Sequence, residues 1–147
     1  INTPYLILDN EMITALSQAA KRGVDVRIVT PHIGDKWFVH AVTRANYAFL
    51  IEDGVKIYEY TPGFIHSKTF VVDGEYAVVG TINLDYRSLY LHFENGLFLY
   101  NNDTVMDIKK DILDTLEDCN RIMPEMCKKN MFFLLLQGIL RIFAPLL

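Results

Sequence analysis

Hydrophobic residues in positions 1–60 alternate between strand spacing and helix spacing. An apolar run over residues 5–8 precedes a helical pattern that ends at Gly23, and alternating apolar positions over residues 24–30 follow. The same order then repeats, with one apolar helical face over residues 37–52 and a strand pattern over residues 55–60. Strands that alternate with helices in this way predict β-α-β units with a parallel sheet.

The spacing changes in the second half of the chain. Two strand-like runs, residues 65–72 and 76–79, are separated by Asp73-Gly74-Glu75, a turn signal that predicts a hairpin. A further strand pattern covers residues 96–100, and an amphipathic helical stripe after it is expected to cover the sheet. Together these patterns predict an α/β fold with a mixed, mostly parallel sheet of about six or seven strands and helices on both faces.

The C-terminal stretch is strongly apolar. Residues 131–140 contain no charge, but this run is shorter than the roughly 20 apolar residues that a membrane-spanning helix needs. We therefore expect a helix within residues 125–147, which either covers the sheet as part of the core or contacts a membrane surface. Three basic residues near its ends would suit anionic lipid headgroups: Lys128, Lys129 and Arg141.

Composition narrows the class of protein further. A chain of 147 residues suits a single domain, and because it does not begin with methionine we expect it to be part of a longer protein. The net charge of −4 argues against nucleic acid as the main partner, since proteins that bind phosphate backbones usually carry a basic face. Cys119 and Cys127 have no metal-ligand or disulfide spacing, so no zinc site is expected.

One segment carries a candidate site, with the pattern His66-x-Lys68-x-x-x-x-Asp73. Alternate residues of a strand face the same side, so we expect the imidazole of His66 and the ammonium of Lys68 to point at one spot. An imidazole that attacks phosphorus or moves a proton, beside a cation that neutralises oxygens, suits phosphoryl transfer. Asp73 has an odd offset from His66 and is expected to stabilise the hairpin turn instead.

Two further segments supply polar groups to the same region. Thr81 and Asn83 lie two residues apart after a strand and can donate hydrogen bonds to a phosphate. Glu94 could hold the Nδ1–H of His66 and fix which imidazole nitrogen faces phosphorus. Arg87 is equally compatible with a phosphate contact and a structural ion pair. The remaining histidines lack a ligand-like spacing and are expected to be surface or structural residues: His32, His40 and His92.

The motif residues resemble the signature of the phospholipase D superfamily: His66, Lys68 and Asp73, then Gly80-Thr81-Ile82-Asn83 and Phe93-Glu94-Asn95. Within that superfamily, segments along nearly the whole chain look like the second half of bacterial cardiolipin synthases: Thr3-Pro4-Tyr5, Gly23–Arg27, Gly54–Tyr60 and Ala144–Leu147. Two residues depart from the family. Thr81 replaces the more common serine but keeps the hydroxyl, and His32 differs in a way that the sequence does not explain.

The resemblance implies a phosphatidyltransferase that makes cardiolipin from two phosphatidylglycerol molecules, with release of glycerol and a phosphohistidine intermediate. Two motifs form one site in that superfamily, with one histidine attacking phosphorus and the other protonating the leaving alcohol. The chain would then be a single catalytic domain, the C-terminal half of a two-motif enzyme, with His66 as the general acid. Lys68, Thr81 and Asn83 would bind the substrate phosphate, and Glu94 would orient His66.

The resemblance also implies partners and a location. It implies no metal and no cofactor, because Lys68 and a partner lysine take the charge-neutralising role of a cation. The expected partners are phosphatidylglycerol, other anionic phospholipids, and either the N-terminal half of the enzyme or a second copy of the chain. The expected location is the cytoplasmic side of a bacterial cell membrane, with an anchor in the N-terminal part.

Two other functions remain open at this point. Superfamily members with one motif build their site by dimerisation, so a homodimeric phosphodiesterase or nuclease is an alternative, and the negative charge argues against it. A non-catalytic domain that binds anionic lipid is another alternative. The intact His66, Lys68 and Asn83 argue against loss of activity.

Overall fold

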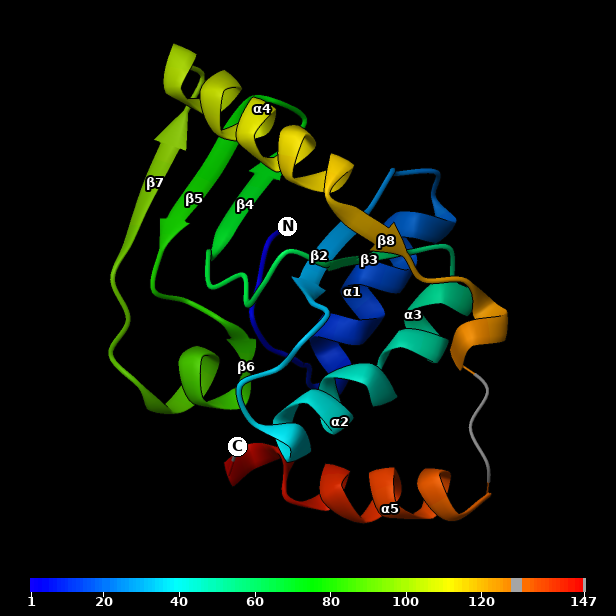
Figure 1. Ribbon diagram of the computed structural model, residues 1–147. Coiled ribbons are helices and arrows are strands. Elements are labelled where there is room, and N and C mark those ends of the chain that lie inside the picture. Colours follow the sequence, from blue (N-terminus) through cyan, green and yellow to red (C-terminus); the bar gives the residue numbers. More distant parts are fainter. Residues whose placement is uncertain (128–130, 147) are drawn as a thin grey trace.

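A computed structural model describes residues 1–127 and 131–146 of the chain (Figure 1). In chain order its strands are β1 (Leu6–Ile7), β2 (Arg27–Pro31), β3 (Lys56–Tyr60), β4 (Thr69–Val72), β5 (Tyr76–Gly80), β6 (Leu84–Asp85), β7 (Gly96–Tyr100) and β8 (Cys119–Arg121). Its helices are α1 (Asn10–Lys21), α2 (Trp37–Ala45), α3 (Tyr47–Glu52), α4 (Asp103–Glu117) and α5 (Met131–Ile142). Shorter helical turns are η1 (Arg87–Leu91), η2 (Pro124–Cys127) and η3 (Ala144–Leu146). This mixture confirms the predicted α/β class.

Two three-stranded units are joined through the N-terminal segment. β2 pairs in parallel with β3 and β3 antiparallel with β8, while β4, β5 and β7 pair antiparallel in the order β4-β5-β7. The backbone of Asn2 bridges Val29 of β2 and Thr69 of β4, with 2.8 Å between Asn2 N and Thr69 O. The strands expected in one mixed sheet of about six or seven therefore occur as two three-stranded units linked at Asn2 and a short two-stranded pair, β1–β6.

The prediction that most strands pair in parallel is wrong. Among the described residues only β2–β3 and the short β1–β6 pair are parallel, whereas three pairings are antiparallel. The reason lies in the connections, because the short link between β4 and β5 allows only an antiparallel neighbour. The β-α alternation of the first part of the chain does not continue beyond β3.

The main core forms where the helices of the first half cover β2 and β3. Ile28 and Ile57 from these two strands are fully buried, and Leu50 of α3 packs against them. The helix predicted over residues 37–52 is divided into α2 and α3 at Asn46, whose side-chain amide donates to the Leu6 carbonyl at 2.8 Å. This long-range bond ties the helix junction to β1.

Two later helices complete the fold (Figure 1). α4 contacts β3, β4, β5 and β7, with Val105 and Ile112 of its predicted apolar stripe buried. α5 lies along α2, and Gln137 Nε2 donates to the Ala41 carbonyl at 3.1 Å. In the part of the chain that the structure describes, no helix is both long and apolar enough to cross a membrane. The basic residues Lys128, Lys129 and Arg141 lie outside the described side chains.

Candidate active site

A tight hairpin turn fixes the end of β4 that is remote from His66. Asp73 and Gly74 have backbone φ angles of 56° and 75°, which is the left-handed pair that a type I′ turn requires. Glu75 N closes the turn by donating to the Val72 carbonyl at 3.0 Å. The predicted hairpin is therefore confirmed, and Asp73 lies in its turn.

His66 and Lys68 lie in the segment that leads into β4. The strand begins at Thr69, so the alternation expected within a strand does not apply to these two residues. Instead, Lys68 Nζ donates to the backbone carbonyl of His66 at 2.7 Å, which folds the ammonium back toward His66. Burial and the charge of Lys68 both lower the pKa of His66.

An open pocket of about 560 Å³ lies beside these residues. Its lining comes from the segment before β4 and the exit of β5: His66, Ser67, Lys68, Thr69, Val79, Gly80, Thr81 and Asn83. Within the described structure, three of its buried polar atoms have no hydrogen-bond partner: Ser67 Oγ, Thr69 Oγ1 and Asn83 Oδ1. Buried polar atoms without partners are rare in folded proteins, and three of them gather in the wall of this pocket.

Lys68 supplies a positive charge to the pocket from a buried position. The residue is only 9% exposed, and burial lowers the pKa of its ammonium, while the carboxylates of Glu94 and Asp85 act in the opposite direction. The Lys68 ammonium is therefore held in the wall of the pocket, where it can neutralise the negative charge of phosphate oxygens.

Glu94 is bonded to Thr81 and not to His66. The Thr81 hydroxyl donates a hydrogen bond to Glu94 and accepts one from Asn95 N at 3.0 Å. The bond from Thr81 lowers the pKa of Glu94. No hydrogen bond between Glu94 and His66 occurs among the described residues, so the expected contact is absent from this structure, and the Thr81 hydroxyl is already engaged.

Gly80 explains why the two segments approach so closely. A Cβ at Gly80 would lie 2.1 Å from the Asn95 carbonyl oxygen and 2.7 Å from Gly96 Cα. Thr81 N donates to the same Asn95 carbonyl at 2.9 Å. Glycine is thus required where β5 leaves the sheet toward the pocket.

Two aromatic rings lie beside His66, and one of them is bonded to Asp35, a loop residue outside any local motif. The rings of Phe64 and Tyr5 flank the imidazole, with centroid distances of 5.4 Å and 6.5 Å. Tyr5 donates its hydroxyl proton to Asp35 Oδ2 at 2.7 Å, and the charge of Asp35 partly opposes the lowered pKa of His66. Asp35 lies thirty-one positions before His66, and no local motif pointed to it.

Asn83 and Arg87 make contacts beside the pocket. Asn83 Nδ2 donates to Ser88 Oγ at 3.2 Å, while its carbonyl oxygen keeps no partner among the described residues. Arg87 donates to His92 Nε2 at 3.0 Å, so Arg87 is held by another side chain in this structure. The described residues contain no cluster of three or more histidine, cysteine, aspartate or glutamate side chains placed to hold a metal ion.

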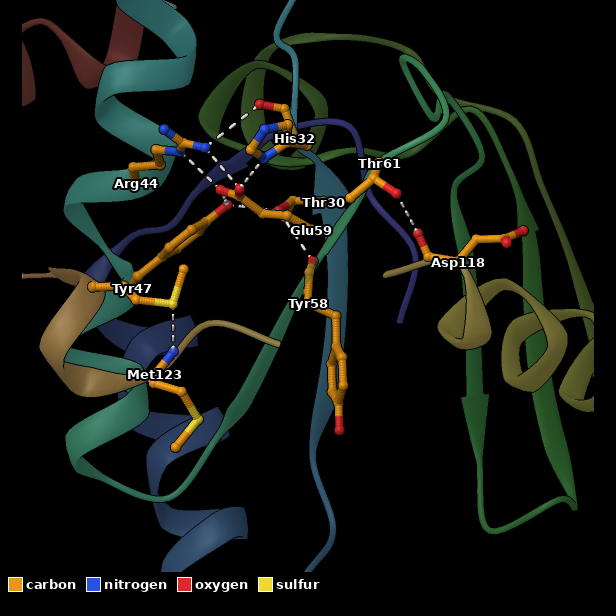
Figure 2. Close-up of polar contacts among 10 residues, drawn as sticks. Thr30, His32, Arg44, Tyr47, Tyr58, Glu59, Thr61, Asp118 and Met123 are labelled. Atoms are coloured by element: carbon orange, nitrogen blue, oxygen red, sulfur yellow. Dashed lines mark hydrogen bonds and ion pairs between the residues drawn. The ribbon is translucent and has the colours of Figure 1, made fainter. Parts of the chain in front are cut away.

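Figure 2 shows a second polar cluster, centred on Glu59 of β3. Glu59 is 1% exposed, and Arg44 binds both its oxygens with N···O distances of 2.7 Å. His32 Nδ1 lies 2.8 Å from Glu59 Oε2, and the Tyr47 hydroxyl donates at 3.2 Å. Burial alone would raise the pKa of Glu59, but the bonds from Arg44 and His32 outweigh it and the pKa is lowered.

This cluster gives His32 a structural place that the sequence did not reveal. His32 begins the loop that carries Asp35, and its backbone is also fixed, because His32 N donates to the Tyr60 carbonyl at 3.0 Å. The Glu59 cluster therefore anchors one end of the loop whose Asp35 accepts a hydrogen bond from Tyr5.

Comparison with known proteins agrees with the motif. A family model described as "Cardiolipin synthase, PLD-like domain" matches residues 1–116. An uncharacterized protein of Streptococcus mutans is 49% identical and a cardiolipin synthase of Halalkalibacterium halodurans is 41% identical, each over the whole chain. The chain covers 32% and 29% of their lengths, so it spans about a third of these relatives.

Two solved structures share the fold. Nuc of Salmonella typhimurium, a phospholipase D family member, has a TM-score of 0.71 at 20% identity and covers 82% of this chain and 78% of its own. A phosphatidylserine synthase of Haemophilus influenzae has a TM-score of 0.75 at 17% identity and covers 99% of this chain and 39% of its own. At such identities the likeness shows the fold alone.

Proposed function

Because this chain belongs to the cardiolipin synthase family with a phospholipase D-like domain, we propose that its protein transfers a phosphatidyl group between two phosphatidylglycerol molecules. The products are cardiolipin and glycerol. The observation that carries the proposal is the pocket where His66 and the buried Lys68 lie beside three unpartnered polar atoms. A phosphate group offers acceptor oxygens to the hydroxyls of Ser67 and Thr69, and a cation beside them suits its charge.

In the proposed reaction His66 moves protons and a second histidine, outside this chain, attacks phosphorus. The P–N bond forms as the P–O bond to glycerol breaks, and His66 gives its proton to the leaving glycerol oxygen. His66 then takes the proton of the acceptor hydroxyl. The oxygen of that hydroxyl bonds to phosphorus as the P–N bond breaks. Lys68 neutralises the phosphoryl oxygens throughout, and the Asn83 amide lies within the same pocket.

We assign the nucleophilic histidine to polypeptide outside this chain. His66 is exposed and its pocket is open, which leaves room for a second surface to close the site. The length supports the same arrangement, because the chain spans about a third of its relatives. The missing surface would come from the N-terminal half of the same protein or from a second copy of the chain.

Contact with the membrane is assigned to the outer face of α5. Met131, Leu135, Ile139 and Ile142 follow one another at helical spacing and are exposed, on the side of the helix opposite Gln137. An apolar helical face in water is typical of helices that lie in the membrane interface. The proposed location is the cytoplasmic side of a bacterial cell membrane, where the lipid substrates are found.

The membrane assignment is tested with phosphatidylglycerol vesicles. Changing Leu135 and Ile139 to aspartate should weaken vesicle binding, because both charges would enter the lipid interface. Leu113→Asp on α4 is the matched control, since Leu113 is also an exposed apolar residue and should leave binding unchanged. Equal binding by the double variant and the control would remove α5 from the membrane contact.

The transfer reaction is tested by glycerol release and cardiolipin formation on phosphatidylglycerol vesicles, with His66→Ala beside the natural sequence. If the 147-residue chain is active and the variant is not, two copies assemble the site. If the chain is inactive, the test moves to the full-length protein. There an active His66→Ala enzyme would overturn the proposed role of His66.

A further inference from the structure

A second pocket adjoins the His66 pocket, and Asn83 lines both. It has a volume of about 210 Å³ and is more enclosed than its neighbour. Its lining combines apolar side chains with both signs of charge: Tyr5, Ile7, Lys36, Val39, Asn83, Asp85, Arg87, Ser88 and His92. The ring of Tyr5 also flanks His66, so a molecule in this pocket would lie next to the reacting phosphorus.

Asp85 is the unusual member of this lining. The residue is 4% exposed, and the pairing of β6 with β1 fixes it opposite Ile7. One oxygen, Oδ1, accepts a hydrogen bond from Ser88 N at 2.7 Å. The other oxygen receives none from the described residues. A buried carboxylate normally has its oxygens paired, so this oxygen is free to accept a hydrogen bond from a ligand hydroxyl.

Positive charge lies at the edge of the same pocket. Lys36 is exposed just before α2, and its side chain caps no helix and forms no ion pair within the described structure. Arg87 adds a second cation, held in place by its bond to His92. An anionic group entering with the ligand would meet these two charges near the pocket mouth.

We infer that this pocket binds the glycerol unit of the acceptor and selects for it. The inference rests on the proposed function and names the acceptor chemistry for the same site. One acceptor hydroxyl is aimed at phosphorus beside His66, a second hydroxyl donates to Asp85 Oδ2, and Lys36 faces the acceptor phosphate. An alcohol without the second hydroxyl would leave the Asp85 oxygen buried and unpaired, which disfavours it.

The test compares two labelled alcohols as acceptors in the full-length protein. Isotope-labelled glycerol and isotope-labelled 1-propanol are offered at equal concentration with phosphatidylglycerol vesicles, and incorporation of each into lipid is measured. Asp85→Asn should lower the glycerol-to-propanol ratio about tenfold or more, because a hydrogen bond to a charged group is lost. The glycerol-to-propanol ratio is measured because the charge of Asp85 also acts on Lys68. A loss of turnover through Lys68 would affect both alcohols equally and leave this ratio unchanged.

The outcomes separate the two proposals. Asp107→Asn, an exposed carboxylate on α4, is the matched control and should keep the ratio of the natural sequence. An unchanged ratio in Asp85→Asn, with propanol still incorporated, overturns the glycerol pocket and leaves the transfer reaction intact. Natural protein that incorporates neither alcohol and forms no cardiolipin overturns the proposed function itself.

A second variant decides the matter if Asp85→Asn does not fold. Lys36→Gln changes an exposed side chain and should fold normally. It should lower cardiolipin formation several-fold relative to incorporation of free glycerol, because only the lipid acceptor carries a phosphate. Parallel losses in both reactions, or no loss in either, would contradict the placement of the acceptor in this pocket.

Discussion

The Glu59 cluster and the His66 pocket contain similar groups in opposite states. Each brings an imidazole and a cationic side chain together, His32 with Arg44 in the first and His66 with Lys68 in the second. In the Glu59 cluster both carboxylate oxygens are bonded and the carboxylate is buried (Figure 2). In the His66 pocket the imidazole is exposed and three neighbouring polar atoms lack partners within the described structure.

This difference separates groups that hold the fold from groups that are available for chemistry. A satisfied buried cluster has no donor or acceptor left for a substrate, and losing one member leaves the others uncompensated. A pocket with unpaired polar atoms gains its partners only when a ligand binds. Substitutions in the first region should therefore reduce stability, and substitutions in the second should reduce turnover.

The largest expected effect is that of His66→Asn in the full-length protein. Turnover to cardiolipin should fall by about 10²–10⁴-fold, the usual contribution of a general acid and base. The free energy of unfolding should change by less than about 0.5 kcal/mol, because the ring is exposed. Both are measured on the same preparation, by product formation and by urea unfolding.

Lys68→Met and Lys110→Met extend this test as a matched pair. Lys110 is an exposed lysine on α4, so its loss should leave turnover unchanged, while loss of Lys68 removes the pocket cation. A His66→Asn protein that is active but unstable would reverse the distinction between the two regions.

Glu59→Gln is expected to have the next largest effect, on stability. Removing the charge leaves Arg44 without its buried counter-ion, which should cost about 3 kcal/mol in urea unfolding at neutral pH. Asp25→Asn is the matched control, because Asp25 also binds two cations, Arg27 and Lys56, but lies at the surface. It should cost at most about 1 kcal/mol. Equal losses would mean that burial does not distinguish the two carboxylates.

The pH dependence of stability provides a smaller and more specific test of the same cluster. The folded-state pKa of Glu59 is lowered, so the unfolded chain binds its proton more readily. The stability that Glu59 contributes is therefore present above the ordinary glutamate pKa of about 4.3 and is lost as pH falls through the lowered folded value. The difference in unfolding free energy between the natural chain and Glu59→Gln should narrow below about pH 4. A difference in unfolding free energy that stays constant down to about pH 3 would contradict the lowered pKa of Glu59.

The sequence predicted what depends on local pattern. The alternating positions of β3, the Asp73-Gly74 turn and the stripe of α4 are all properties of neighbouring residues, and each element was found where the pattern indicated. The short motif also named His66 and Lys68, and both residues line one pocket in the structure. Propensity and spacing are sufficient for such features.

The features that the sequence missed depend on contacts between distant segments. Asn46 divides a predicted helix because its amide bonds to Leu6, forty positions away. Asp35 is bonded to Tyr5, thirty positions away, and its charge raises the pKa of His66. Glu94 was assigned to His66, but the close approach of β5 and β7 at Gly80 gives it Thr81 instead. Rules based on the spacing of neighbouring residues cannot predict such contacts between distant segments.

The smallest expected effect identifies which carboxylate acts on His66. Burial and Lys68 lower the pKa of His66, while Asp35 opposes them, so the imidazole should titrate below the ordinary value of about 6.5. Lys68→Met should raise this pKa, and Asp35→Asn should lower it further, as measured by NMR of the ring protons. Each variant is the control for the other, because a general disturbance of the pocket would shift both in one direction. If Asp35→Asn left the titration unchanged while Glu94→Gln lowered it, the orienting role expected for Glu94 would return and Asp35 would be only a partner of Tyr5.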